Sequence, residues 1–326
     1  MGGGANDRNS VVDVAKGIGI ILVVMGHCHP GIFQKVIIGS FHMPLFFFLS
    51  GLFLFKRDEK FSVFIQKKAK TLLFPCLVFG IILSTYSTLI DVITHNDTIP
   101  FGLRYIGLFI NMRQNPFPGS LWFFPCLFLV ELFLYWIWAL CKDIRIIISY
   151  SIVLALIGGI VHHYYGKGLP WSLDIALYAT LFSAVGYSLR NVIEKKLPFI
   201  FYIIAGLVFC GTTYLNYKYL GDSVDLYSCR IGCYPLFFCS AFSGIALTLG
   251  LSRLMENNIL LKFYGSNSLL IYPIQYLFVL PICKLLSNLV PYGLLNSLLS
   301  TIIVMMIIIP IINVINTHCK WMKGQF

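Results

Sequence analysis

Two neighbouring apolar stretches, VVDVAKGIGIILVVMGHCHP (residues 11–30) and GSFHMPLFFFLSGLF (residues 39–53), decide the fold class. With its apolar neighbours each is long enough to cross a bilayer, because a spanning helix needs about 20 apolar residues. The first stretch nevertheless carries Asp13, Lys16 and His27, and the second carries His42. Ionisable groups inside a membrane are costly, so they typically mark a functional site or a buried ion pair.

The spacing of Lys16 and His27 predicts that both lie on one face of a helix. Their step of eleven residues, at about 100° and 1.5 Å per residue, returns to within about 20° of the starting face, about 16 Å further along the axis. A cation and an imidazole are therefore expected three turns apart on the same face.

The composition of the whole chain is typical of a polytopic membrane protein. Of the 326 residues, 58% are hydrophobic and 11% are charged, and the mean hydropathy is +0.83, which excludes an ordinary soluble domain. The hydropathy pattern predicts an all-α fold with ten transmembrane helices. Their ranges are roughly 10–29, 36–55, 71–93, 120–141, 145–163, 172–190, 198–217, 232–254, 266–288 and 293–316.

The segments between these spans indicate one integral domain over residues 1–326, with residues 1–9 as a flexible tail. No Gly/Ser-rich linker or internal repeat separates the helices. The first apolar run is full length and contains Lys16 and His27, so we interpret it as a retained span and not as a secretory signal. Residues 95–120 include an amphipathic part too short to span, which predicts an interfacial or re-entrant segment.

The distribution of positive charge predicts the orientation in the membrane. If the N-terminus is cytoplasmic, 17 of the 24 Lys and Arg residues fall on the cytoplasmic side, as the positive-inside rule expects. Both termini are therefore predicted to be cytoplasmic, in a plasma (inner) membrane protein that contacts lipid. The net charge of +11 then reflects the orientation of the protein in the membrane and does not indicate a nucleic-acid partner.

The cysteines and histidines do not form a recognisable metal motif. Most of the ten cysteines lie within apolar runs at irregular spacing, which is typical of packing residues. His27, His29 and His42 have neither the i, i+4 spacing nor the acidic third ligand of helix-borne zinc sites. We expect neither a metal nor a disulfide framework.

His27 is the strongest candidate for catalysis at the level of single residues. An imidazole titrates near neutrality and can take a proton from a hydroxyl, and His42 enters the second span from the same side. The alternative is that histidines at the end of a span only contact lipid headgroups, which we consider the better interpretation for His29.

Lys16 and Asp13 are three residues apart, so they can pair on one helix turn. They either neutralise each other near the interface or bind an anionic ligand from the cytoplasm, with Asp13 orienting Lys16. The nearby run KRDEKFSVFIQKKAK (residues 56–70), which contains Lys67, Lys68 and Lys70, can bind phosphates or anionic lipid.

Four further polar residues are weaker candidates for substrate binding. Glu131 lies within a predicted span, where a carboxylate must be protonated or paired. Arg113 and Asn115 precede a predicted span and either line an outward mouth or form a polar loop tip. Ser50 is either a small packing residue at a helix crossing or a nucleophile, although no base is adjacent in the sequence.

Five motifs spread over most of the chain resemble those of the membrane acyltransferase-3 family. They are DVAKGIGIILVVMGH (13–27), FHMPLFFFLSG (41–51), KKAKTLLFP (67–75), LWFF (121–124) and GSNSLLIYPIQ (265–275). Two positions depart from the family pattern. Lys16 stands where Arg is common and lacks its bidentate fork, and Gln275 stands where many relatives have His.

The resemblance implies a ten-helix membrane enzyme that transfers acetyl groups from cytoplasmic acetyl-CoA to hydroxyls of a glycan or lipid-linked sugar. It implies that His27 is catalytic, with His42 and Ser50 as second-helix motif residues. It also implies that Lys16 contacts CoA, and we extend this CoA-binding role to Asp13 and the Lys67–Lys70 segment. The resemblance adds Trp122 to the substrate-binding candidates.

Two alternatives remain open from the sequence. A transporter or flippase would use Asp13, Lys16 and Glu131 along a substrate or proton path, and an inactive relative would serve as a binding scaffold. Since the chain shows no fused extracytoplasmic domain, either direct transfer or a separate extracytoplasmic transferase partner is expected.

Overall fold

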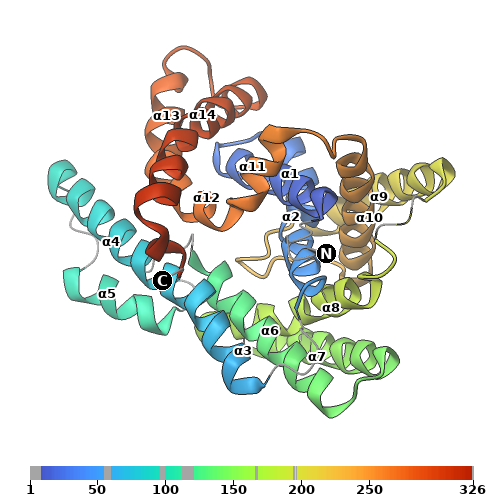
Figure 1. Ribbon diagram of the computed structural model, residues 1–326. Helices are drawn as coiled ribbons and strands as arrows, with labels where there is room; N and C mark the ends of the chain where they lie inside the picture. Colours follow the sequence, from blue (N-terminus) through green and yellow to red (C-terminus); the bar gives the residue numbers. More distant parts are fainter. Residues whose placement is uncertain are drawn as a thin grey trace, which may run out of the picture.

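The computed structural model describes residues 9–54, 60–95, 100–111, 121–165, 168–193, 195 and 197–324 (Figure 1). The helices are α1 (Ser10–His27), α2 (Ile32–Gly51), α3 (Phe61–Lys68), η1 (Ala69–Leu73), α4 (Phe74–Thr94), α5 (Phe101–Ile110), α6 (Phe123–Leu140), α7 (Ile144–Tyr165), η3 (Pro170–Ser172), α8 (Leu173–Leu189), α9 (Phe199–Leu220), α10 (Tyr234–Leu254), α11 (Ile259–Ser266), α12 (Ser268–Ile274), η4 (Gln275–Leu277), α13 (Val279–Ser287), α14 (Leu294–His318) and η5 (Lys320–Lys323).

The prediction of an all-α polytopic membrane protein is confirmed. Nine helices of the described part are long and apolar enough to cross a membrane, and one bent pair adds a tenth candidate. The same residues contain no β-strand, and only Asp225 and Arg230 form an isolated bridge.

The predicted ninth span, residues 266–288, is broken in the structure. Residues Ser268–Leu277 and Val279–Ser287 form two helical pieces bent by 51°. Pro273 and Pro281 lie on either side of the break, and a proline within a helix removes a backbone hydrogen bond and kinks the chain. The break places Tyr276 in the short η4 turn.

The predicted third span begins earlier than hydropathy indicated. Helices α3, η1 and α4 form one candidate span, Phe61–Thr94, with a π-helical turn at Ala69–Leu73 just before Pro75. The predicted interfacial segment contains α5, which is too short to cross a bilayer. An ion pair between Arg104 and Asp91 holds α5 to α4.

Helices α1 and α11 pack with their backbones almost in contact. A Cβ atom on Gly17 would lie 2.2 Å from the carbonyl oxygen of Leu261, and a Cβ atom on Gly265 would lie 1.7 Å from that of Asp13. Only glycine fits at these two positions, and the close contact fixes the start of α1 beside α12.

Both ends of the described chain lie at the same end of the bundle, because Asn9 and Lys323 line one cavity. We call this the terminal end, and we call the opposite end, where α1 finishes at His27, the distal end. At the terminal end α2 crosses α8, where the Ser183 hydroxyl donates to the Phe47 carbonyl oxygen at 2.7 Å and lies 3.3 Å from the Ser50 hydroxyl.

Candidate active site

One continuous helix carries the two principal candidate residues. The side chain of Asn9 caps α1 by accepting from the backbone N–H of Val11 at 3.1 Å, and the helix runs unbroken to His27. Lys16 lines the cavity at the terminal end. The structure therefore places the cation and the imidazole on one continuous helix, eleven residues apart.

The cavity at the terminal end has a volume of about 500 Å³ and is lined by α1, α2, α4, α6, the α3–η1 segment, the α11–α12 turn and η5; we call it the terminal cavity. Its polar and charged lining residues are Asn9, Asp13, Lys16, Ser50, Lys68, Thr71, Glu131, Ser266, Asn267, Ser268 and Lys323. Three lysines and two carboxylates give these residues a small positive excess, which favours an anionic ligand.

Glu131 is paired, one of the two states expected for a carboxylate within a span. The Lys68 Nζ atom lies 2.9 Å from its Oε1 atom, and the two side chains are 16% and 5% exposed. The charges of Lys67 and Lys16 also act on this carboxylate. Glu131 thus holds the basic α3–η1 segment against α6 at the wall of the terminal cavity.

At the distal end, His27 contacts a tyrosine from the broken span. The Tyr276 hydroxyl lies 2.7 Å from Nε2 of His27, and the ring centroids are 4.8 Å apart. His27 is exposed, whereas Tyr276 is half-buried. The neighbouring Gln275 is fully buried and donates from Nε2 to the carbonyl oxygen of Tyr272 at 3.1 Å.

His42 is held in one tautomer by the backbone of its own helix. Its Nδ1 lies 2.6 Å from the carbonyl oxygen of Ile38, and because a carbonyl can only accept, Nδ1 carries the proton of the neutral ring. The Asp225 carboxylate acts electrostatically on His27, and so does His42 when its ring is protonated. We call His27, His42, Asp225 and Tyr276 the distal cluster.

Asp225 lies in the α9–α10 loop (residues 221–233), which folds over α2. The loop backbone packs tightly there, since a Cβ atom on Gly39 would lie 2.2 Å from the carbonyl oxygen of Val224. The Asp225 carboxylate accepts from the Tyr227 N–H at 3.1 Å and from the Ser228 hydroxyl, and it acts on His27 through its charge. Asp222 in the same loop accepts from the Ser223 N–H and pairs with Arg230 at 2.8 Å. The hydrogen bond from Ser223, and then the charge of Arg230, lower the pKa of Asp222.

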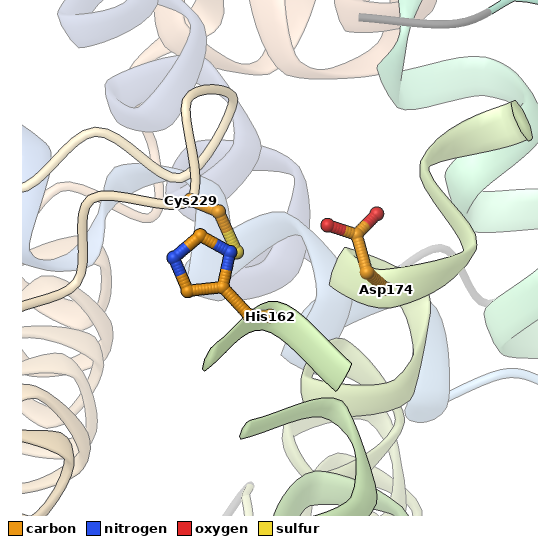
Figure 2. A group of neighbouring side chains, drawn as sticks. All are labelled: His162, Asp174 and Cys229. Carbon is orange, nitrogen blue, oxygen red and sulfur yellow. The ribbon is translucent and has the colours of Figure 1, made fainter. Parts of the chain in front are cut away.

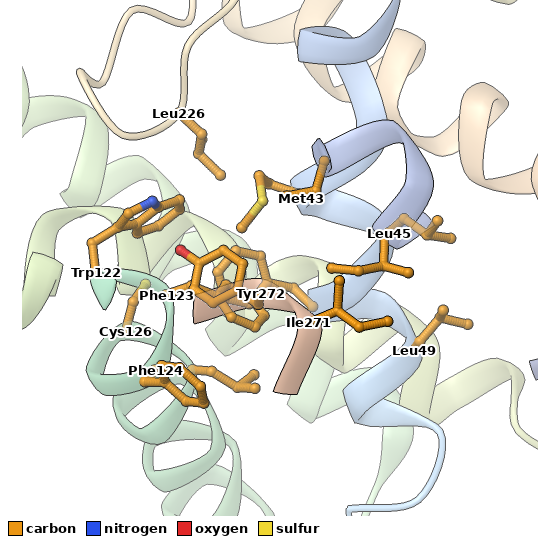
Figure 3. Close-up of a cluster of buried hydrophobic side chains, with 14 of the residues drawn as sticks. Met43, Leu45, Leu49, Trp122, Phe123, Phe124, Cys126, Leu226, Ile271 and Tyr272 are labelled. Atoms are coloured by element: carbon orange, nitrogen blue, oxygen red, sulfur yellow. The ribbon is translucent and has the colours of Figure 1, made fainter. Parts of the chain in front are cut away.

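An aromatic layer lies between the terminal cavity and the distal cluster. Phe46 and Phe123 line the cavity, with ring centroids 6.0 Å apart, and Phe123 packs edge-on against Tyr272 at 5.6 Å. Figure 3 shows Phe123 and Tyr272 within the buried apolar cluster that joins α2, α6 and α12. Trp122 is buried beside Phe123 and packs against Tyr227 of the α9–α10 loop at 6.0 Å.

The remaining predicted residues lie away from these two places or cannot be located. Lys67 and Lys70 are exposed on the α3–η1 segment and are not among the residues that line the terminal cavity. His29 is exposed and its ring packs against Tyr292 at 4.9 Å. Arg113 and Asn115 lie outside the described residues.

Sequence reasoning missed Tyr276, Asp225 and Lys323. Tyr276 directly follows the motif GSNSLLIYPIQ (residues 265–275), which is a usable signal in the sequence. Asp225 and Lys323 come from a loop and a C-terminal turn that no motif marks, and only the folded chain brings them to the two sites.

Comparison with known proteins identifies the family of the chain. A family model described as "Acyltransferase domain" matches residues 9–315, which is most of the chain. Comparison with curated proteins and with solved structures gives no match. The matched range includes every helix that builds the terminal cavity and the distal cluster, except the η5 turn. The chain therefore belongs to the acyltransferase-3 family, and it is a multi-pass membrane acyltransferase.

Proposed function

We propose that the protein transfers acetyl groups from cytoplasmic acetyl-CoA to hydroxyl groups of a glycan or lipid-linked sugar at the other face of the plasma membrane. The single observation that carries the proposal is the arrangement on α1, where Lys16 lines the terminal cavity and His27 meets Tyr276 at the distal end. In this proposal both termini face the cytoplasm.

The donor would bind at the terminal cavity. Its phosphates would pair with Lys16, Lys68 and Lys323, which line that cavity. Lys67 and Lys70, on the exposed face of the same segment, would draw the anion toward it, because clustered cations raise the local concentration of anionic ligands. Asp13 would orient Lys16.

The acyl group would then pass the aromatic layer toward His27. The rise of α1 between Lys16 and His27 is about 16 Å, which roughly matches an extended pantetheine arm. Phe46 and Phe123 line the terminal cavity, and in this proposal rotation of their side chains would admit the thioester toward His27.

The chemistry would take place at the distal cluster. In this proposal Nε2–H of His27 donates to the Tyr276 oxygen, 2.7 Å away, which leaves Nδ1 unprotonated to take the proton of the acceptor hydroxyl. The hydroxyl oxygen would attack the thioester carbonyl carbon, the C–S bond would break, and His27 would return the proton to the departing CoA thiolate. Asp225 would stabilise the imidazolium formed between these steps, since its charge acts on His27.

Incubation of the purified protein with acetyl-labelled acetyl-CoA tests the proposal. Label should leave CoA and appear in an added glycan acceptor or, without an acceptor, as free acetate. A transporter or flippase would leave the thioester intact while moving its substrate across a vesicle membrane. If the label stays on CoA both with and without acceptors, acyl transfer from this donor is contradicted.

A further inference from the structure

A second group of chemically reactive side chains lies at the distal end, away from His27. His162 comes from the last turns of α7, Asp174 from the first turn of α8, and Cys229 from the α9–α10 loop. Each offers one donor atom, and the three atoms lie within 4.8 Å of one another. Figure 2 shows the three side chains converging on a common point from three separate segments.

We propose that His162, Asp174 and Cys229 bind one zinc ion. Nitrogen, oxygen and sulfur donors from these residue types are the usual ligands of Zn²⁺, and three protein ligands leave a fourth position for water. A tetrahedral site with normal bond lengths separates its ligand atoms by about 3.4–3.8 Å, so small side-chain rotations bring the three donors into position.

Charge and burial support this assignment. Asp174 is 1% exposed and Cys229 is 2% exposed, and burying a charge is costly unless it is compensated. When Zn²⁺ binds, the Cys229 thiol releases its proton to solvent. One thiolate and one carboxylate then balance the two positive charges of the metal, so the assembled site is neutral in its apolar surroundings.

The local fold directs each ligand inward and supplies contacts behind it. Cys229 ends a turn closed by the Asp225–Arg230 bridge and has a left-handed backbone with φ of 55°. The Tyr178 hydroxyl makes a hydrogen bond with Cys229 and lies 3.0 Å from the Tyr234 hydroxyl. Such hydrogen bonds to a ligand atom orient it and tune the metal.

The geometry does not fit the other chemistry available to these residue types. In a Cys-His-Asp relay the imidazole lies between the sulfur and the carboxylate and uses both of its nitrogens. Here the sulfur, one ring nitrogen and one carboxylate oxygen are all within 4.8 Å of one another. They converge on one point, as ligands of a common ion do.

A metal bound at this site would have a structural role. The metal would fasten the α9–α10 loop to the ends of α7 and α8, and the same loop presents Asp225 to the distal cluster. The sequence predicts no metal site because these ligands come from three distant segments that match no spacing motif.

Metal analysis of the full-length protein purified in detergent without chelators tests the proposal. We expect about one zinc per chain, and a loss of at least about fivefold in His162→Gln, Asp174→Asn and Cys229→Ser, since each removes one of three ligands. The matched controls are His163→Gln, the exposed neighbour on α7, and Cys233→Ser in the same loop; both should retain the zinc.

Cobalt substitution provides a second readout, which shows on the unmodified chain whether a thiolate binds the metal. Adding Co²⁺ to protein stripped of metal should give a thiolate-to-cobalt charge-transfer absorption that Cys229→Ser lacks. The proposal is overturned if the chain holds no zinc after incubation with Zn²⁺ and desalting, or if Cys229→Ser holds as much as the controls. Neither measurement requires acyl transfer, so failure here leaves the proposed function untouched.

Discussion

The hydroxyl of Tyr276 lies 2.7 Å from Nε2 of His27, although the two residues are 249 positions apart in the chain. The contact arises because the first piece of the broken span ends in the η4 turn, which begins at Gln275 and contains Tyr276. Gln275 turns into the protein and donates to the carbonyl oxygen of Tyr272. The hydroxyl of Tyr276, one residue later, therefore contacts His27.

Replacing Tyr276 with Phe should slow acetyl transfer about tenfold, which corresponds to ~1.4 kcal/mol and to one hydrogen bond. The ring would still pack against His27, so only its orientation through the hydroxyl is lost. The effect should appear in kcat, and the pH–rate profile should shift, whereas KM for acetyl-CoA should stay constant. Tyr292→Phe is the matched control, because Tyr292 packs against His29. Equal rates in both variants would contradict the role of the Tyr276 hydroxyl.

Replacing His27 with Ala should reduce acetyl transfer by about 10²–10⁴-fold, the usual contribution of a general base. His29→Ala, two residues further along, should keep most of the activity, since His29 contacts Tyr292 outside the distal cluster. Labelled acetyl-CoA measures the rate, and thermal unfolding in detergent verifies that both variants are folded. If His27→Ala retained acetyl transfer, the proposed catalytic role of His27 would be contradicted.

The parts of the fold that depend on local sequence were predictable. Runs of about 20 apolar residues predict spans because the bilayer requires them, and the structure contains nine such helices with a tenth, broken candidate among its described residues. Hydropathy did not place the break between Leu277 and Val279, because the window averages over this segment, although Pro273 and Pro281 in the sequence indicate a kink there. It also placed the start of the third span too late, because the amphipathic α3 continues into α4 through η1.

Only the part of the candidate site that lies on a single helix was predictable from the sequence. Lys16 and His27 follow from helical spacing, because both lie on α1. Tyr276, Asp225 and Lys323 reach the two sites through tertiary contacts between distant segments, and local periodicity contains no information about such contacts. For the same reason, the sequence does not show that His162, Asp174 and Cys229 lie close together in the fold.

Replacing Lys16 with Met should raise KM for acetyl-CoA by about 10- to 100-fold, since a hydrogen bond to a charged group contributes ~1.5–3 kcal/mol. Lys16→Arg should keep KM close to that of the original chain, because the charge remains and the guanidinium suits phosphate. The KM of the original protein should rise with salt more steeply than that of Lys16→Met. Lys35→Met, at the exposed start of α2 near the distal end, should leave KM unchanged. An unchanged KM in Lys16→Met would place the donor phosphates elsewhere.

Breaking the Lys68–Glu131 pair should destabilise the protein unequally according to which partner is removed. In Lys68→Met the Glu131 carboxylate, 5% exposed, loses its ion-pair partner, and removing one member of a buried pair costs about 3–5 kcal/mol. In Glu131→Gln the remaining Lys68 is 16% exposed and can extend toward water, as lysine side chains do at the end of a span. Thermal unfolding followed by tryptophan fluorescence should therefore show a larger fall in Tm for Lys68→Met.

The double variant Lys68→Met, Glu131→Gln separates a true pair from two independent side chains. If the two charges interact, the double variant should regain most of the Tm lost in Lys68→Met, because it leaves no charge behind at the pair. Lys67→Met, on the exposed face of the same helix, should change Tm little. Additive losses in the double variant would mean that the contact at 2.9 Å contributes nothing to stability, and the basic α3–η1 segment would then be held to α6 by apolar packing alone.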